Sequence, residues 1–365
     1  MNDRHAARID RLRRLLAGMD HDAIVVSSTT NVGYLTGFTG DSTPLLVTRD
    51  RAIAVSDFRY AEALGDECPG LETHIRPVAR KLWAAVAEVV DKLGVKHLAF
   101  EANAMLVADQ IALRDALPAV AIAAVFGRVE SLRAVKDDGE VAAVRAAIRA
   151  AERAFRMLRD GLDPRESELQ TAELLESFLK RCGSSRPAFD PIVAAGPRSA
   201  LPHATPTVAG SIGEHPFVLV DWGATVSGYR SDLTRMIVTG NVGEEFGRIY
   251  RTVLDAQARA IAAIRPGARA SDVDAAARTA IEEAGFGKLF GHGLGHGIGL
   301  AVHESPSLRP DSDDVLLPGM IVTVEPGIYR PGWGGIRIED DILVTLDGCE
   351  VLTSLPKSME SLTLP

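Results

Sequence analysis

The chain has 365 residues, of which 46% are hydrophobic, and a formal net charge of −9. This length and composition exclude a disordered or fibrous protein and predict two domains with buried cores. The negative charge, with no dense stripe of lysine and arginine, argues against a nucleic-acid partner, because phosphate binding requires a positive surface. Three widely spaced cysteines, Cys68, Cys182 and Cys349, indicate neither a disulfide framework nor a thiolate metal site.

The amino-terminal segment argues against export. Its first twenty residues carry charges throughout and lack the apolar stretch of a secretory signal. The most apolar window, residues 117–126, is shorter than the roughly 20 residues needed to cross a bilayer. We therefore expect a cytoplasmic protein with no membrane partner.

The first half of the chain alternates between helical and extended patterns, which indicates an α/β region. Apolar residues recur at helical spacing over residues 9–16, and the apolar run at residues 22–28 predicts a short buried strand. Residues 43–60 predict two strands joined by a turn at residues 48–51, and residues 83–94 predict a helix.

A charged connector at residues 133–139 interrupts this alternation, and a long amphipathic helix follows at residues 140–159. We place the domain boundary here, so that residues 1–133 form one domain and residues 134–365 the other. A further helix ends at Gly183. Beyond it, proline and glycine punctuate short apolar strands, and five of the nine histidines lie in this second half.

Two segments of the second half share a pattern of strand, turn and strand. In residues 217–238, Asp221 and Asp232 are symmetric about a centre between Val226 and Ser227. We therefore expect the two carboxylates to face each other across antiparallel strands, with Cβ atoms about 4.5–5.5 Å apart.

The second such segment, residues 321–344, repeats the arrangement with glutamates. Glu325 and Glu339 are symmetric about Gly332, which lies in the glycine-rich stretch RPGWGG. Four acids that converge on one pocket would repel one another unless they were protonated or neutralised by cations. The positive charge of two divalent ions would balance the negative charge of four carboxylates. Oxygen-rich coordination favours manganese-like or cobalt-like ions.

A nitrogen ligand is offered by the segment GHGLGHGIGL at residues 291–300, which holds His292 and His296. Its five glycines disfavour a helix, because each costs roughly 1 kcal/mol relative to alanine, and they predict an extended strand or a loop that other backbone approaches closely. On an extended strand the two histidines would share a face, so that one could bind metal while the other contacts substrate. Taken singly, each motif is more often a plain turn, and His203 could be a solvated loop residue.

In order and spacing, these motifs resemble the pita-bread metallopeptidases, a family that comprises aminopeptidase P, prolidase, methionine aminopeptidase and the metal-free creatinase. The five metal-ligand motifs of that family match Asp221 in VDWGA, Asp232 in SDLTR, His296 in GHGIGL, Glu325 in EPGIY and Glu339 in RIEDD. The resemblance implies an α+β protein whose C-terminal domain has the pita-bread fold, two αββ halves related by pseudo-twofold symmetry.

The first half of the chain resembles the smaller α/β creatinase-like N-terminal domain of the proline-specific members, on the stretches NVGYLTGFTG and SDFRY. Methionine aminopeptidases lack this domain. The resemblance therefore implies cleavage of the bond between an N-terminal residue and a following proline, as in aminopeptidase P. The alternatives are an Xaa-Pro dipeptidase (prolidase), a non-catalytic pita-bread module that binds a protein, and a metal-free hydrolase like creatinase.

The resemblance also implies a role for each metal-binding residue. Asp221 would bind one divalent ion, Asp232 and Glu339 would bridge two, and His296 and Glu325 would bind the second. Manganese is the preferred ion, with cobalt and zinc as alternatives. Glu325 would also act as general base for the attacking water and later as proton donor.

Four further residues resemble active-site groups of the family. His292 and His303, the latter in VHESP, match histidines that contact the substrate, and His203 in LPH matches a third active-site histidine. Arg337, two residues before Glu339, resembles an arginine that orients the metal ligands. The family further implies a homodimer, to which the segment around Phe38 and Tyr60 could contribute.

Overall fold

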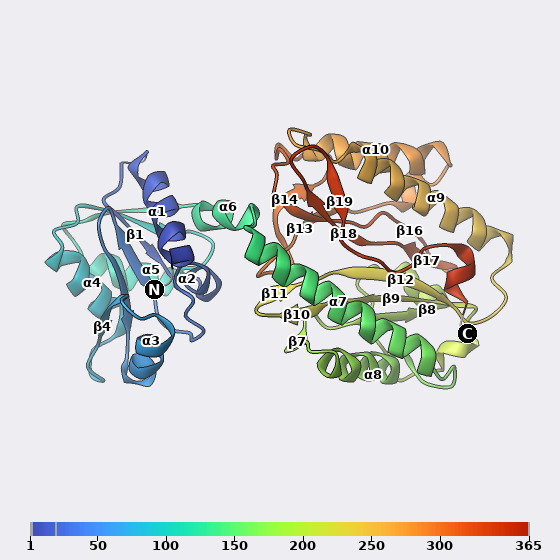
Figure 1. Ribbon diagram of the computed structural model, residues 1–365, viewed down its shortest axis with the longest axis horizontal. Helices are drawn as coiled ribbons and strands as arrows, with labels where there is room; N and C mark the ends of the chain where they lie inside the picture. The colour runs from blue at the N-terminus through green and yellow to red at the C-terminus, as the bar shows by residue number, and fades with distance from the viewer. Residues whose placement is uncertain (1–2, 19, 364–365) are drawn as a thin grey trace. The chain divides into compact units, whose positions relative to one another are not determined.

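The computed structural model describes residues 3–18 and 20–363, and the chain divides into two compact units, residues 1–133 and 134–365 (Figure 1). The connector between the short helix α6 and the long helix α7, which flank this division, is shorter than predicted. Helix α6 continues to Ala134 and helix α7 begins at Asp138, so only residues 135–137 lie outside a helix. Within the described residues, no helix has both the length and the apolar character needed to cross a bilayer.

The first unit is built on a six-stranded mixed sheet in the order β4-β3-β2-β1-β5-β6, with a buried core rich in valine, leucine and alanine. The predicted strands at residues 45–48 and 52–56 and the predicted helix from residue 83 are confirmed. Its strands are β1 Ala23–Val26, β2 Leu45–Thr48, β3 Ala52–Ser56, β4 Glu72–Ile75, β5 His97–Glu101 and β6 Ala121–Val125. Its helices are α1 Asp3–Ala17, α2 Thr29–Thr36, α3 Ala61–Glu67, α4 Leu82–Lys92, α5 Val107–Ala116 and α6 Arg128–Ala134.

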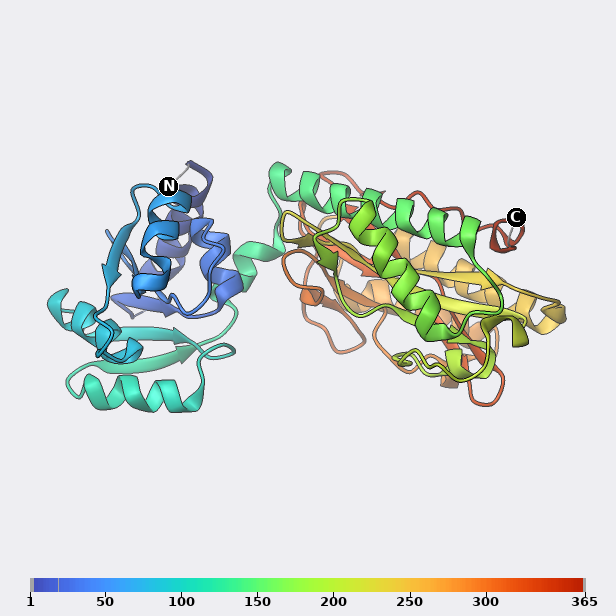
Figure 2. The ribbon, with the colours of Figure 1, turned by 90° about the horizontal axis from the view of Figure 1, so that it is seen from below.

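The second unit pairs two helices with each of two sets of strands, as Figures 1 and 2 show. Helices α7 Asp138–Gly161 and α8 Glu168–Arg181 pack on the earlier strands. Helices α9 Gly243–Ala263 and α10 Ala270–Glu283 pack on the later ones. This repetition of a helix pair and a strand hairpin is the duplicated architecture that the resemblance implies.

The earlier strands form two three-stranded sheets, β11-β10-β7 and β12-β9-β8. They are β7 Arg186–Pro187, β8 Ile192–Ala195, β9 Phe217–Trp222, β10 Ala224–Val226, β11 Tyr229–Arg230 and β12 Leu233–Val238. The later strands form a five-stranded sheet, β14-β13-β15-β18-β19, and the pair β16-β17. They are β13 Gly295–Gly297, β14 Glu304–Leu308, β15 Ile321–Val324, β16 Gly327–Arg330, β17 Gly334–Arg337, β18 Asp340–Val344 and β19 Cys349–Val351.

Helix α7 fixes the position of the strand that carries Asp221. The helix begins with a capping box, in which Asp137 and Glu140 each bind the other's backbone N–H. Trp222, at the end of β9, stacks on Phe155 of α7 with ring centroids 4.2 Å apart. The Trp222 indole also donates to the carbonyl of Ala151 over 3.0 Å, so its one polar group is satisfied in the core.

The centre of the first hairpin lies one position later than predicted, so that each residue pairs with a partner two residues further along the chain. Asp221 lies opposite Thr234, and the turn consists of Ser227 and Gly228, both with positive φ. A two-residue turn of this kind matches the twist of the flanking strands. Asp221 and Asp232 are therefore not directly opposite each other, and instead lie diagonally on the same face.

The second hairpin has the predicted register. Val324 lies opposite Asp340 and Gly327 lies opposite Arg337, which centres the hairpin on Gly332. Gly332 has a φ of 79°, a conformation that glycine adopts without strain. Glu325 and Glu339 therefore lie opposite each other across the hairpin.

Candidate metal centre and active site

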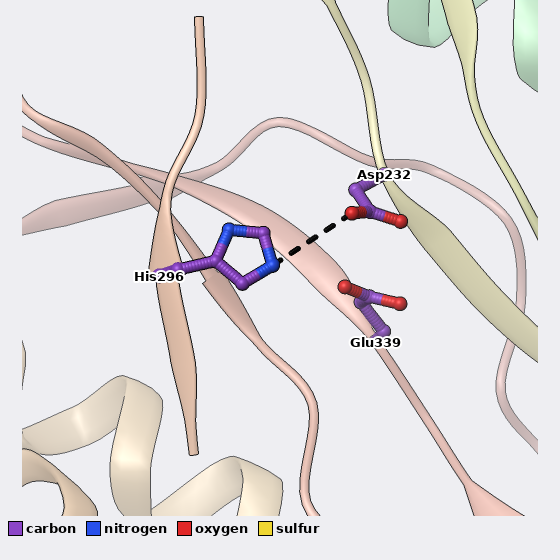
Figure 3. A group of neighbouring side chains, drawn as sticks. All are labelled: Asp232, His296 and Glu339. Atoms are coloured by element: carbon purple, nitrogen blue, oxygen red, sulfur yellow. Dashed lines mark ion pairs between the residues drawn. The ribbon is translucent and has the colours of Figure 1, made fainter. Parts of the chain in front are cut away.

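Three residues from distant parts of the chain bring potential metal-binding atoms together. Asp232 immediately precedes β12, His296 lies on β13, and Glu339 immediately precedes β18. One ligand atom of each lies within 4.8 Å of the others. Figure 3 shows the His296 ring pointing toward both carboxylates, with its Nε2 3.8 Å from Asp232 Oδ2.

Glu325 joins this group through His296 and Thr323. Its Oε1 lies 3.4 Å from His296 Nε2 and accepts from the Thr323 hydroxyl over 3.3 Å. The same hydroxyl oxygen accepts from the backbone N–H of His296 over 3.0 Å. Thr323 therefore fixes the spacing between the strand that carries the histidine and the strand that leads to the glutamate.

Asp221 reaches the site from β9 and is held by Arg337. The guanidinium of Arg337 donates to Asp221 Oδ2 over 2.5 Å, and both residues are buried. The other oxygen, Asp221 Oδ1, is buried and has no hydrogen-bond partner. A buried carboxylate oxygen without a donor carries a desolvation cost that a bound cation would offset.

Arg337 also connects the two hairpins to each other. Besides Asp221, its guanidinium donates to the Thr234 hydroxyl over 3.0 Å, to the Tyr329 hydroxyl over 2.8 Å and to the carbonyl of Pro202 over 3.3 Å. The Thr234 hydroxyl in turn donates to Glu339 Oε2 over 2.6 Å. A single guanidinium therefore orients an acid of each hairpin.

Thr234, Tyr329 and Thr323 were not identified from the sequence. A signal for two of them is the alternation of side chains along a strand. Thr234 lies two positions after Asp232, and Thr323 two positions before Glu325, so each shares a face with a predicted ligand. Tyr329 carries no such local signal, because its role depends on contacts with His292 and Arg337 across the hairpin.

Burial and mutual repulsion raise the pKa values of the acids. Burial is the largest cause for Asp232 and Glu339, and neighbouring carboxylates add to it, so the pKa of each lies well above its ordinary value. Burial also raises the pKa of Glu325 to about 7. Burial raises the pKa of Asp221 as well, although Arg337 opposes the shift. Without cations the cluster therefore retains protons near neutral pH.

The histidine of the cluster is presented in the form that binds metals. Burial lowers the pKa of His296 to about 4, which keeps the imidazole neutral at physiological pH. Its Nδ1 lies 3.1 Å from the carbonyl of Gly297, which can only accept, so Nδ1 carries the proton. The lone pair of Nε2 then faces Asp232 and Glu325, as a metal ligand requires.

His292 lies in the loop before β13, and His296 lies on the strand itself, so the segment is part loop and part strand and the two histidines do not share a strand face. Irregular backbone separates them. Burial lowers the pKa of His292 to about 4. Its Nδ1 faces the carbonyl of Gly293 at 2.7 Å, and its Nε2 faces the Tyr329 hydroxyl at 2.9 Å. His292 therefore belongs to the network of Tyr329 and Arg337.

The remaining two predicted histidines are exposed. The His303 ring meets the His296 ring edge to face, with centroids 4.4 Å apart. His203 follows Pro202, whose carbonyl accepts from Arg337. Both histidines thus border the buried acids from the solvent side, where a substrate could meet them.

The donor set fits a pair of divalent cations. It consists of four carboxylates and one neutral imidazole, with no thiolate, and oxygen-rich sets of this kind suit manganese-like ions. The unpartnered oxygen of Asp221 and the raised pKa values of Asp232, Glu325 and Glu339 both indicate a site that lacks positive charge.

Family comparisons agree with this geometry. Residues 142–346 match the model of metallopeptidase family M24, and residues 8–135 match the creatinase/prolidase N-terminal domain. The chain belongs to metallopeptidase family M24. The expected pita-bread fold and creatinase-like N-terminal domain are thereby confirmed for this M24 protein.

Relatives of this M24 protein match it over almost its whole length. The uncharacterized peptidase YqhT of Bacillus subtilis is 38% identical over 354 residues, which cover 96% of this chain and 99% of the relative. The structure of the Xaa-Pro dipeptidase from Bacillus anthracis has 38% identity and a TM-score of 0.93, and the match covers 97% and 99% of the two chains. The structure of the X-Pro aminopeptidase from Thermotoga maritima MSB8 has 33% identity and a TM-score of 0.87, with 96% and 99% covered.

Proposed function

We propose that this M24 protein is a peptidase that hydrolyses the bond between an N-terminal residue and a following proline. The observation that carries the proposal is the convergence of Asp221, Asp232, His296, Glu325 and Glu339 on one buried site. The similarity to an Xaa-Pro dipeptidase and an X-Pro aminopeptidase supports the choice of substrate. Because all five residues are present and converge, neither a non-catalytic module nor a metal-free hydrolase is proposed.

We further propose that Asp221, Asp232, His296, Glu325 and Glu339 hold two divalent ions, with manganese preferred over cobalt and zinc. Asp232 and Glu339 would serve both ions. Bound cations of this kind lower the pKa of water and polarise a carbonyl group. The charge of the four carboxylates supports two ions over one.

Glu325 is proposed as the residue that moves the proton. Its carboxylate accepts a proton from the attacking water and returns it to the proline nitrogen of the leaving group. Burial raises the pKa of Glu325 to about 7, which supports a group that can hold a proton between the two transfers. Thr323, which donates to Glu325 Oε1, keeps the carboxylate oriented during both transfers.

His292, His303 and His203 are proposed to contact the substrate. The two exposed rings, His303 and His203, can donate to the scissile carbonyl oxygen and to the carboxylate of a bound peptide. His292 and Arg337 meet at the Tyr329 hydroxyl, which orients both. A proline peptide bond has no N–H, so recognition through carbonyl and carboxylate groups suits this substrate.

The length of the substrate decides between the two proposed activities. We place the dipeptidase first, ahead of the aminopeptidase, because the dipeptidase structure is the more similar of the two described above. The test is hydrolysis of an Xaa-Pro dipeptide and of an Xaa-Pro-Xaa tripeptide by the manganese-loaded protein. Cleavage of the dipeptide alone supports the dipeptidase, and cleavage of the tripeptide as well supports the aminopeptidase. Cleavage of neither refutes the proposed function.

We also propose a cytoplasmic homodimer with an N-terminal domain of residues 1–133 and a catalytic domain of residues 134–365. Light scattering at several concentrations tests the dimer. Within the N-terminal domain, Phe38 is buried against Tyr60, with ring centroids 5.6 Å apart, whereas Phe58 is exposed. Contact with a second copy through this segment would therefore involve Phe58 in place of Phe38.

A further inference from the structure

The hairpin that carries both glutamates is interrupted at the glutamates themselves. Strand β15 ends at Val324 and β16 begins at Gly327, while β17 ends at Arg337 and β18 begins at Asp340. In the register of this hairpin, Pro326 stands opposite Ile338. The Ile338 N–H donates to the Pro326 carbonyl over a long 3.5 Å, and proline has no N–H with which to return the bond. The carbonyl of Ile338 is therefore left without its partner across the hairpin.

Gln257 supplies the missing donor from helix α9. Its side-chain Nε2 donates to the carbonyl of Ile338 over 3.2 Å and to the carbonyl of Val324 over 3.0 Å. These are the peptide groups that directly precede Glu339 and Glu325. Gln257 is 1% exposed, so its amide is shielded from bulk solvent. One side chain thus bridges the two strands at the position where a backbone hydrogen bond between them is missing.

Lys357 determines which way the Gln257 amide points. The Lys357 ammonium lies 2.8 Å from Gln257 Oε1, and an ammonium can only donate. The amide oxygen must therefore face Lys357, which leaves both N–H groups for the two carbonyls. Lys357 also pairs with Asp340, which accepts from Arg235 over 2.7 Å, and Arg235 donates to the carbonyl of Glu339 over 2.6 Å.

We propose that Gln257 is a positioning residue for Glu325 and Glu339, and that Lys357 acts on the same glutamates by orienting the Gln257 amide. Gln257 reaches the hairpin from the side on which Val324 packs with the apolar residues of α9. It touches neither glutamate side chain. Its effect on the proposed metal ligands passes through the backbone of the hairpin. The inference rests on the proposed function, because it takes the two glutamates to be metal ligands.

The test compares Gln257→Met with Lys357→Met and with a control, Val253→Ala. Methionine keeps the length of glutamine and removes both amide donors, whereas Val253, one turn earlier on α9, is buried in the core and has no hydrogen-bonding group in its side chain. Manganese(II) is titrated into chelator-treated protein and followed by electron paramagnetic resonance. Thermal unfolding and the kcat and KM for an Xaa-Pro dipeptide are measured on the same samples.

We expect Gln257→Met to weaken manganese binding by about tenfold, at the lower end of what loss of a ligand-supporting partner causes, and to lower kcat more than it changes KM. Lys357→Met should also weaken manganese binding and lower kcat, each by a smaller factor. The control should lower the melting temperature and leave manganese affinity unchanged.

Two results would overturn the positioning role. One is wild-type manganese affinity in both methionine variants, and the other is a loss of affinity in the control equal to that in Gln257→Met. If Gln257→Met does not fold, the Lys357→Met variant alone tests the positioning role, because Lys357 is partly exposed and its replacement disturbs the core less. A wild-type protein that binds manganese without cleaving either the dipeptide or the tripeptide would count against the proposed peptidase activity, and the titration would still test Gln257.

Discussion

The Thr234 hydroxyl is an uncharged group that joins candidate metal ligands of the two hairpins. It donates to Glu339 Oε2 over 2.6 Å and accepts from Arg337 over 3.0 Å, and the side chain is fully buried. Thr234→Val keeps the β-branched shape, which β-strands favour, and removes both hydrogen bonds. The substitution therefore tests the hydroxyl with little change in packing.

In the manganese-loaded protein, the size of the effect follows from the charges of Glu339 and Arg337, the two partners of the hydroxyl. A hydrogen bond to a charged group contributes about 1.5–3 kcal/mol, and a buried charge left without its partner costs a similar amount. Arg337 retains its bonds to Asp221 and Tyr329, which limits the loss. We expect the free energy of unfolding to fall by about 3 kcal/mol, and manganese affinity to fall by roughly 10- to 100-fold, because Glu339 loses a group that orients it.

Calorimetric titration with manganese and urea unfolding followed by circular dichroism measure the two quantities. Thr234→Ser is the matched control, because it keeps the oxygen and removes only a methyl group. The serine variant should retain manganese affinity within about threefold of the wild type, a difference of roughly 0.7 kcal/mol. If the valine and serine variants bind manganese equally well, the hydroxyl does not orient Glu339 and the reasoning is wrong.

Three further predictions concern the same site. Asp232→Ala should abolish dipeptide cleavage and weaken the binding of both ions, and elemental analysis that still finds two tightly bound ions would contradict its shared role. His303→Ala should lower kcat while metal content stays unchanged, so a large loss of metal would argue against a substrate-contacting role. In the metal-free protein the raised pKa values of Asp232 and Glu339 mean that the unfolded chain ionises first, so stability should fall as pH rises from 6.5 to 8. Each carboxyl still protonated in the folded state contributes about 1.4 kcal/mol per pH unit to that fall, and urea unfolding with and without manganese should show the slope only without it.

The two hairpins show how far sequence reasoning reaches. The glutamate hairpin was predicted in its correct register, because its two acids are symmetric about Gly332, a residue able to form the turn. The centre of the aspartate hairpin was placed one position too early, and its pairing two residues out of register, because its two acids are not symmetric about the turn. Gly228, at the second position of the two-residue turn, marks the true centre and was the more reliable signal.

Other features of the site depend on contacts that local patterns do not encode. The sequence identified the acids, His296 and Arg337 by motif, and the structure places them together. It did not identify Tyr329 or Gln257, because each acts on groups far away in the chain. Gln257 donates to the carbonyl that Pro326 cannot serve, and the missing N–H of Pro326 matters only once the register of the hairpin is known. Helix α9 shows an ordinary amphipathic pattern, in which a buried glutamine gives no indication of its partners.

The balance of charge at the site links these observations to the number of ions. Four carboxylates face one guanidinium, that of Arg337, and the pKa values of Asp232, Glu325 and Glu339 are raised as a result of burial and crowding. One divalent cation would leave the ionised cluster negative, whereas two would leave a single positive charge, which one hydroxide neutralises. Because burying uncompensated charge is costly, the metal-free cluster keeps protons and a cluster with two cations can release them. Binding of the second ion should therefore release protons, and it should weaken steeply as the pH falls.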